Sequence, residues 1–142
     1  MFIGIDLVEI PRIAKAVQNP RFLSRIYTPS EQALAERLPT LQRRAEFFAG
    51  RFAVKEAAYK AISALYQQQI FPTLAAPDAQ RKLPLLIFTE IETRRNDEGL
   101  PNLQFYGQTK ELLASLPILQ SQISLSHTRT LATAIVLLDY PH

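Results

Sequence analysis

Four side chains recur every four residues in the segment Phe47–Lys60, and their chemistry changes along the row. Phe48 and Phe52 are aromatic whereas Glu56 and Lys60 are charged, so on a helix an apolar row would continue as a carboxylate and an ammonium. Such a row would point inward at one end and present reactive groups at the other. The alternative is a solvated surface pair, which is the usual role of an isolated Glu/Lys pair at this spacing. Two other segments of the chain favour a functional role instead.

A carboxylate also interrupts the apolar run at the N-terminus. Asp6 stands within FIGIDLVEI, a run that is typical of a strand buried on both faces or central in a sheet. Burial of an ionised carboxylate is costly unless the charge is paired, hydrogen-bonded or bound to a cation, so Asp6 is a candidate metal ligand. The alternative is that Asp6 ends the strand and caps a helix that starts near Glu9.

A polar turn joins two strand-like segments near the C-terminus, in ISLSHTRTLATAIVLL. Ile123 and Leu125 alternate with serines, and the turn at residues 127–130 precedes a second apolar strand. The pattern gathers hydroxyls, an imidazole and a guanidinium at one hairpin tip, as phosphate binding would require. An ordinary hydrophilic turn is the alternative.

Together these segments resemble the holo-[acyl-carrier-protein] synthase family, the small phosphopantetheinyl transferases. The family pattern has four ordered motifs: a Gly-Ile-Asp strand leading into Glu-x-x-Arg-Ile, a central signature of Ala-Gly-Arg-Phe-Ala, Lys-Glu-Ala and Lys-Ala, a Gly-x-Pro turn, and a Ser-x-Ser-His-Thr hairpin. Matches lie at residues 4–6 with 9–13, 49–61, 99–101 and 124–128. The resemblance spans nearly the whole chain, and the ordered set is far more specific than any one motif.

The resemblance implies transfer of the 4'-phosphopantetheine arm of coenzyme A onto a serine of an acyl carrier protein, with release of adenosine 3',5'-bisphosphate. The nucleophile would belong to the carrier protein, which agrees with the lack of an apparent Ser-His-Asp or Cys-His pattern. The enzyme would stabilise charge on the breaking pyrophosphate and supply a base for the attacking hydroxyl. Mg²⁺ held by one or two carboxylates, waters and substrate phosphate suits this role.

The central signature carries most of the implied site. By residue-wise carry-over, Asp6 and Glu56 are the metal ligands, and Glu56 is the base, directly or through a metal-bound water. Lys60 would neutralise phosphate charge beside the metal. Arg51 and Lys55 would be further contacts to phosphate or to the carrier protein.

The remaining implied contacts are to the adenosine end of coenzyme A. His127 and Thr128 resemble contacts to its 3'-phosphate, while Gly99 and Pro101 shape the turn that approaches its adenine portion. The chain departs from the family after Lys60, where a short glycine-containing turn is usual and none follows. This departure bears on coenzyme A affinity more than on metal binding, because backbone amides approach phosphate most closely at glycine.

The order of elements predicts a single α+β domain over residues 1–142, with helices packed on one face of a mostly antiparallel sheet. This agrees with the fold that the resemblance implies, a 4'-phosphopantetheinyl transferase-like fold with a long helix. A glycine at position 50, inside that helix, indicates close approach of another backbone or of a ligand. Helices are predicted near residues 9–18, 28–38, 41–65 and 108–115, and strands near 2–8, 83–94, 103–107 and in the hairpin 123–138, with a Pro-, Gln- and Ala-rich connection at 67–83.

The basic residues favour an acidic protein partner. The net charge is +3, but residues 1–66 hold ten Lys or Arg against six Asp or Glu. Four of these cations lie within fourteen residues: Arg12, Lys15, Arg21 and Arg25. Acyl carrier proteins resemble acidic helical bundles, so electrostatic docking is the interpretation, and a solvated helix face is the alternative. The family is usually a homotrimer with sites shared between subunits, which implies that apolar strands are buried between chains.

Composition limits the other classes. The chain has no cysteine, so neither a disulfide framework nor a thiol nucleophile is available. It shows no secretory apolar segment and no run of membrane-spanning length, which predicts a cytoplasmic protein. Two alternatives stay open: an inactive family member that only binds a carrier protein, and a small basic nucleic-acid-binding module, although no aromatic platform interleaves with the cations. The sequence does not say whether the carrier serves fatty acid synthesis, polyketide synthesis or another process.

Overall fold

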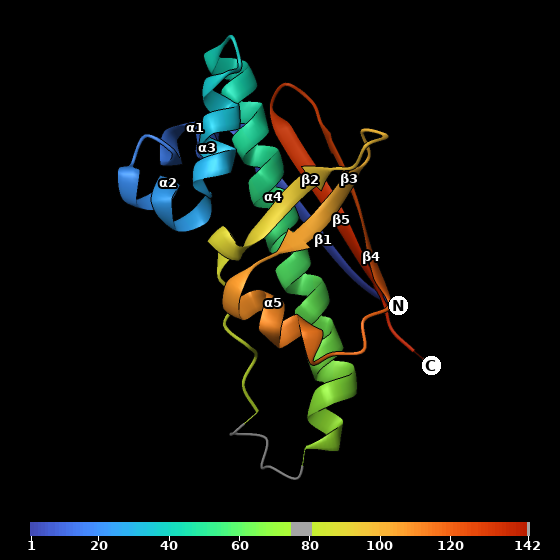
Figure 1. Ribbon diagram of the computed structural model, residues 1–142. Helices are drawn as coiled ribbons and strands as arrows, with labels where there is room; N and C mark the ends of the chain where they lie inside the picture. Colours follow the sequence, from blue (N-terminus) through green and yellow to red (C-terminus); the bar gives the residue numbers. More distant parts are fainter. Residues whose placement is uncertain (75–80, 142) are drawn as a thin grey trace.

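A 25-residue helix, α4, runs along the molecule, and the other elements gather around it (Figure 1). The computed structural model describes residues 1–74 and 81–141. Its elements in chain order are β1 (Phe2–Glu9), α1 (Ile10–Ala16), α2 (Pro20–Ile26), α3 (Pro29–Glu36), α4 (Leu41–Leu65), the short turns η1 (Tyr66–Ile70), η2 (Phe71–Thr73) and η4 (Phe88–Glu90), β2 (Ile91–Arg95), β3 (Pro101–Phe105), α5 (Gly107–Ala114), β4 (Gln120–His127) and β5 (Leu131–Asp139).

Three antiparallel strands in the order β1-β5-β4 form the larger sheet, and its inner face packs on α4. The registers pair Asp6 with Ala134 and His127 with Ala132, so β1 and β4 are the two edges. Side chains on successive residues of a strand point to opposite faces. Every second residue of β5 is therefore buried against the helix, and these four are Ala132, Ala134, Val136 and Leu138.

Small side chains bring α4 unusually close to β1. Four alanines at positions 49, 53, 57 and 61 form a row along α4 and have no exposed surface. Gly4 lies over this row, where an added Cβ would stand 1.8 Å from the carbonyl oxygen of Ala57 and 2.8 Å from the amide nitrogen of Ala61. Asp6 follows two residues later on the same face of β1. The close contact at Gly4 therefore decides how near Asp6 comes to α4.

The outer face of β1 corrects one prediction. The strand is not buried on both faces and is not central, because Ile3, Ile5 and Leu7 are 60%, 56% and 65% exposed at the edge of the sheet. Beside them on β5, Ile135 is 39% exposed. An apolar run was correctly recognised as a strand, but half of its side chains face outward from the single chain.

The second sheet is smaller than the sequence pattern suggested. Residues 83–94 were predicted as one strand, but only β2, from Ile91, pairs with β3. The preceding residues include η4, where Glu90 accepts hydrogen bonds from the amides of Gln108 (3.2 Å) and Thr109 (2.8 Å) at the start of α5. The turn between β2 and β3 has Gly99 at φ +82°, a conformation that favours glycine.

Helix signals in the sequence were mostly reliable. The helix predicted near residues 28–38 begins with a capping box, in which Thr28 and Glu31 exchange hydrogen bonds. Helix α2 was missed, although Asn19 caps it and Pro20 is its first residue, both of which are start signals. Helix α4 ends at Leu65 as predicted, and η1 and η2 continue the helical path to Thr73. The rest of the predicted connection includes residues 75–80, which lie outside the described residues.

The prediction of an α+β fold with mostly antiparallel strands and a long helix is confirmed, although the strands form two sheets. No helix within residues 1–74 and 81–141 is both long and apolar enough to cross a membrane.

Candidate active site

Asp6 and Lys60 meet at the open edge of the larger sheet. The Nζ atom of Lys60 donates hydrogen bonds to Oδ1 of Asp6 (3.1 Å) and to the carbonyl oxygen of Ile5 (2.9 Å). The Asp6 side chain is 14% exposed and the Lys60 side chain 51%, so the pair faces the surface from one side only. Asp6 does not cap α1, whose N-terminus has no side-chain cap. Its backbone is held by Thr133, whose hydroxyl donates to the Asp6 carbonyl oxygen (2.8 Å).

Glu56 lies one turn before Lys60 on α4 and shares a cavity with Asp6. The cavity has a volume of about 390 Å³ and is lined by Asp6, Leu7, Val8, Glu9, Arg12, Ile13, Ala16, Phe22, Phe52 and Glu56. Burial raises the pKa of Glu56 above its ordinary value, the nearby charge of Asp6 raises it further, and Lys60 acts in the opposite direction. The two carboxylates are thus close enough to repel, and the ammonium of Lys60 compensates part of their charge.

A divalent cation fits this pair of carboxylates. Mg²⁺ takes oxygen ligands and keeps several waters, so two carboxylates are a sufficient protein contribution. In the part of the chain that the structure describes, no group of three or more His, Cys, Asp or Glu side chains gathers as a metal site. A cation here would therefore rely on Asp6, Glu56 and non-protein ligands, and the ammonium of Lys60 currently holds the position beside Asp6.

A second, basic cavity lies toward the other end of α4. It has a volume of about 230 Å³ and is lined by Leu38, Arg43, Glu46, Phe47, Gly50, Arg51, Arg95, Leu125, Ser126 and His127. Gly50 opens this cavity, because an added Cβ there would meet only the Cδ1 atom of Leu125, at 3.5 Å. The predicted close approach of a backbone therefore occurs at Gly4 and not at Gly50, where the structure leaves room for a ligand.

Arg51 joins this cavity to a larger neighbour of about 470 Å³ that is also lined by Arg95. Its guanidinium carbon lies 4.3 Å from the centre of the Phe47 ring, which restricts the orientation of the group. Burial lowers the pKa of Arg51, with the carboxylate of Glu31 acting in the opposite direction. A planar cation held in this way is suited to bidentate binding of phosphate.

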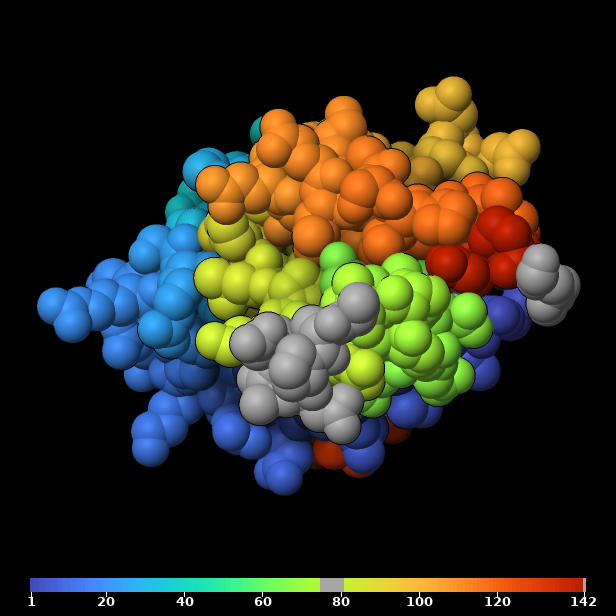
Figure 2. All heavy atoms as spheres, turned by 90° about the horizontal axis from the view of Figure 1, so that it is seen from below, coloured from blue at the N-terminus to red at the C-terminus, as the bar shows by residue number. Residues whose placement is uncertain are grey.

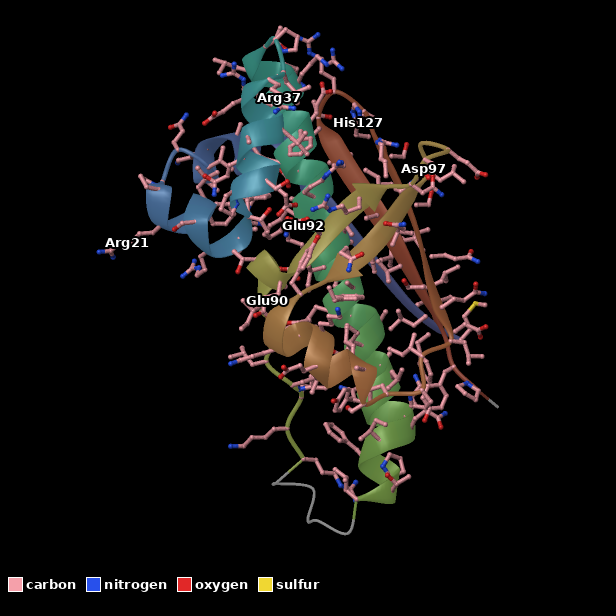
Figure 3. All side chains as sticks on the ribbon, viewed as in Figure 1. Arg21, Arg37, Glu90, Glu92, Asp97 and His127 are labelled. Carbon is pink, nitrogen blue, oxygen red and sulfur yellow. The ribbon has the colours of Figure 1, made fainter. Side chains whose placement is uncertain are left out.

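The hairpin tip of β4 and β5 is fastened to α4. His127 Nδ1 lies 3.6 Å from Oε2 of Glu46, and Gln42 donates to Oε1 of Glu46 and to the carbonyl oxygen of Arg129, at 2.9 Å each. The Thr128 hydroxyl accepts hydrogen bonds from backbone amides of the turn and keeps its own O–H as a donor. His127 lies at the tip of this hairpin (Figure 3), and it lines the basic cavity.

The β2–β3 turn reaches the same cavity through Arg95. Its guanidinium donates to the carbonyl oxygen of Gly99 (2.8 Å), and it also lines the cavity with Arg51. Pro101 begins β3 opposite Arg95 in the ladder. Gly99 therefore lies in the turn and Pro101 directly after it, while Arg95, which carries the turn to the cavity, was not recognised from sequence.

The predicted site residues fall into two clusters. Asp6, Glu56 and Lys60 form one, and the structure brings Arg51 and His127 together in the other, with Gly99, Pro101 and Thr128 at its edge. Along α4, Arg51 of the second cluster is five residues before Glu56, and Glu46, which contacts His127, is ten residues before it. The clusters are therefore about 8 to 15 Å apart along the helix. Their catalytic and binding roles stay predictions.

Lys55 belongs to neither cluster, and the expectation of a phosphate or carrier contact is wrong for it. Its side chain is 1% exposed. Its three donors are used by Oε1 of Glu31 (2.8 Å), the carbonyl oxygen of Phe88 (2.7 Å) and that of Ile91. Thr28 in turn donates to Glu92 on β2. Lys55 therefore ties α3 and β2 to α4 and has no donor left for a ligand.

Three further residues of the basic cavity were missed: Arg43, Glu46 and Arg95. For Arg43 and Glu46 a signal existed, because they precede Gly50 by seven and four residues and so share its helix face. No sequence signal indicated Arg95, because its position in the cavity depends on how the second sheet packs.

The four predicted partner residues line one groove. It has a volume of about 540 Å³ and is lined by Arg12, Lys15, Ala16, Asn19, Arg21, Phe22 and Arg25. Arg21 projects from α2 away from the body of the molecule, on the other side of α4 from His127 (Figure 3). Arg12 and Phe22 also line the cavity of Asp6 and Glu56, so the basic groove opens beside the carboxylates and not beside the basic cavity.

Sequence comparison decides the family. The sequence profile of the 4'-phosphopantetheinyl transferase superfamily matches residues 2–134. The chain belongs to this superfamily. It is 37% identical over 139 residues to a holo-[acyl-carrier-protein] synthase of Dehalococcoides mccartyi, with 96% of each chain covered, and 34% identical over 139 residues to that of Desulfovibrio desulfuricans, with 96% of this chain and 95% of the other covered.

Solved structures agree with the sequence match. The fold is similar to the Chronobacterium ammoniagenes ACPS–CoA complex, with a TM-score of 0.77, 32% identity and coverage of 99% of this chain and 98% of the other. It is also similar to the Bacillus anthracis holo-(acyl-carrier-protein) synthase in complex with CoA (3',5'-ADP), with a TM-score of 0.67, 31% identity and coverage of 99% and 96%. The family predicted from the four motifs is confirmed.

Proposed function

We propose that this protein transfers the 4'-phosphopantetheine group of coenzyme A to a serine of an apo-acyl carrier protein, in a Mg²⁺-dependent reaction that releases adenosine 3',5'-bisphosphate. The observation that carries the proposal is the pair Asp6 and Glu56, brought to one cavity by the contact of Gly4 with α4. Relatives named holo-[acyl-carrier-protein] synthase over nearly their full length support it. The cytoplasmic location stays a prediction.

Each residue of the first cluster has a role in this reaction. Asp6 and Glu56 would hold the cation, which supplies charge stabilisation on the pyrophosphate. Glu56, whose pKa is already raised, is our candidate for the group that accepts the proton of the attacking serine. Lys60 would leave Asp6 when a cation arrives, and its half-exposed ammonium then becomes available to phosphate.

The basic cavity is proposed to bind the 3'-phosphoadenosine end of coenzyme A, through Arg51, Arg95, His127 and Thr128. Because the two clusters line separate cavities along one helix, we propose that complete sites form between subunits of a homotrimer. The exposed apolar residues of β1 support this assembly, since large apolar patches on a single chain commonly mark interfaces.

His127 offers a test of the phosphate contact. His127→Ala should raise the KM for coenzyme A about tenfold and leave the KM for 3'-dephospho-coenzyme A nearly unchanged, because only the former has the group that His127 would contact. Steady-state kinetics with both substrates measure the difference. Equal weakening of both would place His127 elsewhere in the site.

The carrier-protein surface is tested by charge reversal. The double variant Arg21→Glu/Arg25→Glu should raise the KM for the carrier protein at least tenfold and leave that for coenzyme A unchanged, because these charges act on docking. The effect should shrink as salt rises, since the screening length falls to about 10 Å at 0.1 M. Reversal of Arg37 on the far end of α3 is the matched control, and an equal effect there would contradict a local docking surface.

The decisive experiment incubates the protein with apo-acyl carrier protein, coenzyme A and Mg²⁺ and measures the mass of the carrier. A gain of one phosphopantetheine group on the carrier serine is expected. Binding of carrier without any transfer would favour an inactive family member. Tight, salt-sensitive binding of DNA or RNA without transfer to any carrier tried would favour the nucleic-acid alternative.

A further inference from the structure

An apolar groove continues the basic groove on the side away from the carboxylates. It has a volume of about 360 Å³ and is lined by Arg25, Ile26, Leu85, Leu86, Ile87 and Phe88. Arg25 lines both grooves, just as Arg12 and Phe22 line both the basic groove and the cavity of Asp6. The surface therefore runs without a break from carboxylates through cations to apolar side chains.

The residues of this groove differ sharply in burial. Ile26 is 9% and Leu86 is 7% exposed, so they form a firm floor, whereas Leu85 is 87% exposed at the rim. Figure 2 shows residues 81–88 (yellow-green) between α2 (blue) and the C-terminal end of α4 (green). The leucine and the apolar floor beneath it form a contiguous apolar patch, which is a common feature of interaction surfaces.

We propose that this groove binds an apolar side chain of the acidic carrier protein, with Leu85 as the contact, and so extends the docking surface beyond the cations. The inference rests on the proposed function, since it takes the carrier protein as the partner. Arg25 favours this partner, because it lines both grooves. A carrier protein whose acidic side chain pairs with Arg25 would have its neighbouring residues over the apolar groove.

The arrangement matches the anatomy of protein interfaces. Cations at the rim steer an acidic partner and fix its orientation, while an apolar anchor in a pocket contributes affinity. Among the described residues that line the basic groove, Phe22 is the one large apolar side chain, and it is shared with the cavity of Asp6 and Glu56. Leu85 and the groove would supply that anchor next to the cations.

The test compares Leu85→Ser with Leu119→Ser, a matched change at a leucine that is 67% exposed before β4. Leu85→Ser should raise the KM for the carrier protein about fivefold, with kcat, the KM for coenzyme A and Tm unchanged. Leu119→Ser should change none of these. The Leu85 effect should persist at high salt, whereas that of Arg25→Ala should shrink, because only the second is electrostatic.

Four results would overturn the inference. The first two are an unchanged KM for the carrier protein in Leu85→Ser and an effect no larger than that of Leu119→Ser. The third is a fall in the Tm of Leu85→Ser, which would show that Leu85 packs within its own chain. The fourth is binding of anionic phospholipid vesicles by the unaltered protein that Leu85→Ser abolishes. Direct titration with apo-carrier protein separates this inference from the proposed function. If the unaltered protein binds carrier without transfer and Leu85→Ser weakens binding, the docking surface stands while the activity fails.

Discussion

Asp6→Asn and Glu56→Gln should each lower kcat/KM for transfer about a thousandfold at saturating coenzyme A. Each change removes one negative ligand from a pair that shares one cavity, and loss of the cation removes several kcal/mol of charge stabilisation from the transition state. Both substitutions keep the shape of the side chain. Transfer kinetics at several Mg²⁺ concentrations, with Mn²⁺ affinity measured by electron paramagnetic resonance, check the prediction.

The controls separate metal binding from folding. Glu111→Gln on the exposed face of α5 removes a carboxylate far from the cavity and should leave both readouts unchanged. Lys60→Gln should weaken coenzyme A but should not lower Mn²⁺ affinity, because Lys60 competes with a cation for Asp6. Full activity of either carboxylate variant at limiting Mg²⁺, or lower Mn²⁺ affinity in Lys60→Gln, would contradict the assignment.

The sequence was most informative where the chemistry is local. The row of Phe48, Phe52, Glu56 and Lys60 passes from 8% exposed at Phe48 to an exposed ammonium at Lys60, as the four-residue spacing predicted. Helix propensity, the capping box and strand alternation depend on near neighbours, so their signals survive in a single sequence. The cost of an unpaired carboxylate indicated that Asp6 needs a partner, but its ion pair with Lys60, fifty-four residues away, was not predicted.

What could not be predicted depends on contacts between distant segments. Lys55 and Lys60 look alike in the sequence, yet one is enclosed by Glu31 and two carbonyl groups while the other is half exposed. Arg95 enters the basic cavity only because the β2–β3 sheet packs beside α4. The exposure of Ile3, Ile5 and Leu7 on β1 could not be predicted either. An apolar residue in a strand has the same sequence pattern whether its own chain or a second copy covers it.

Gly4 is the second position with a large expected effect. Gly4→Ala should lower the free energy of unfolding by about 3 kcal/mol, because the new Cβ would lie 1.8 Å from a backbone oxygen of α4 that cannot rotate away. For a chain of this size the loss corresponds to a fall in Tm of about 10 °C. Thermal unfolding by circular dichroism measures it. Transfer should fall as well, because a shift of β1 moves Asp6 away from Glu56 and Lys60.

Gly50→Ala is the matched control, since it makes the same change at a buried glycine on α4. Its Cβ would meet only a side-chain methyl group at 3.5 Å, and replacing a mid-helix glycine by alanine stabilises a helix by up to about 1 kcal/mol. Its Tm should therefore rise by a few degrees. If both variants lost stability equally, the close contact of β1 with the alanine row would not be what holds the strand. A stable Gly4→Ala variant that transfers normally would show that Asp6 does not depend on this contact for its position.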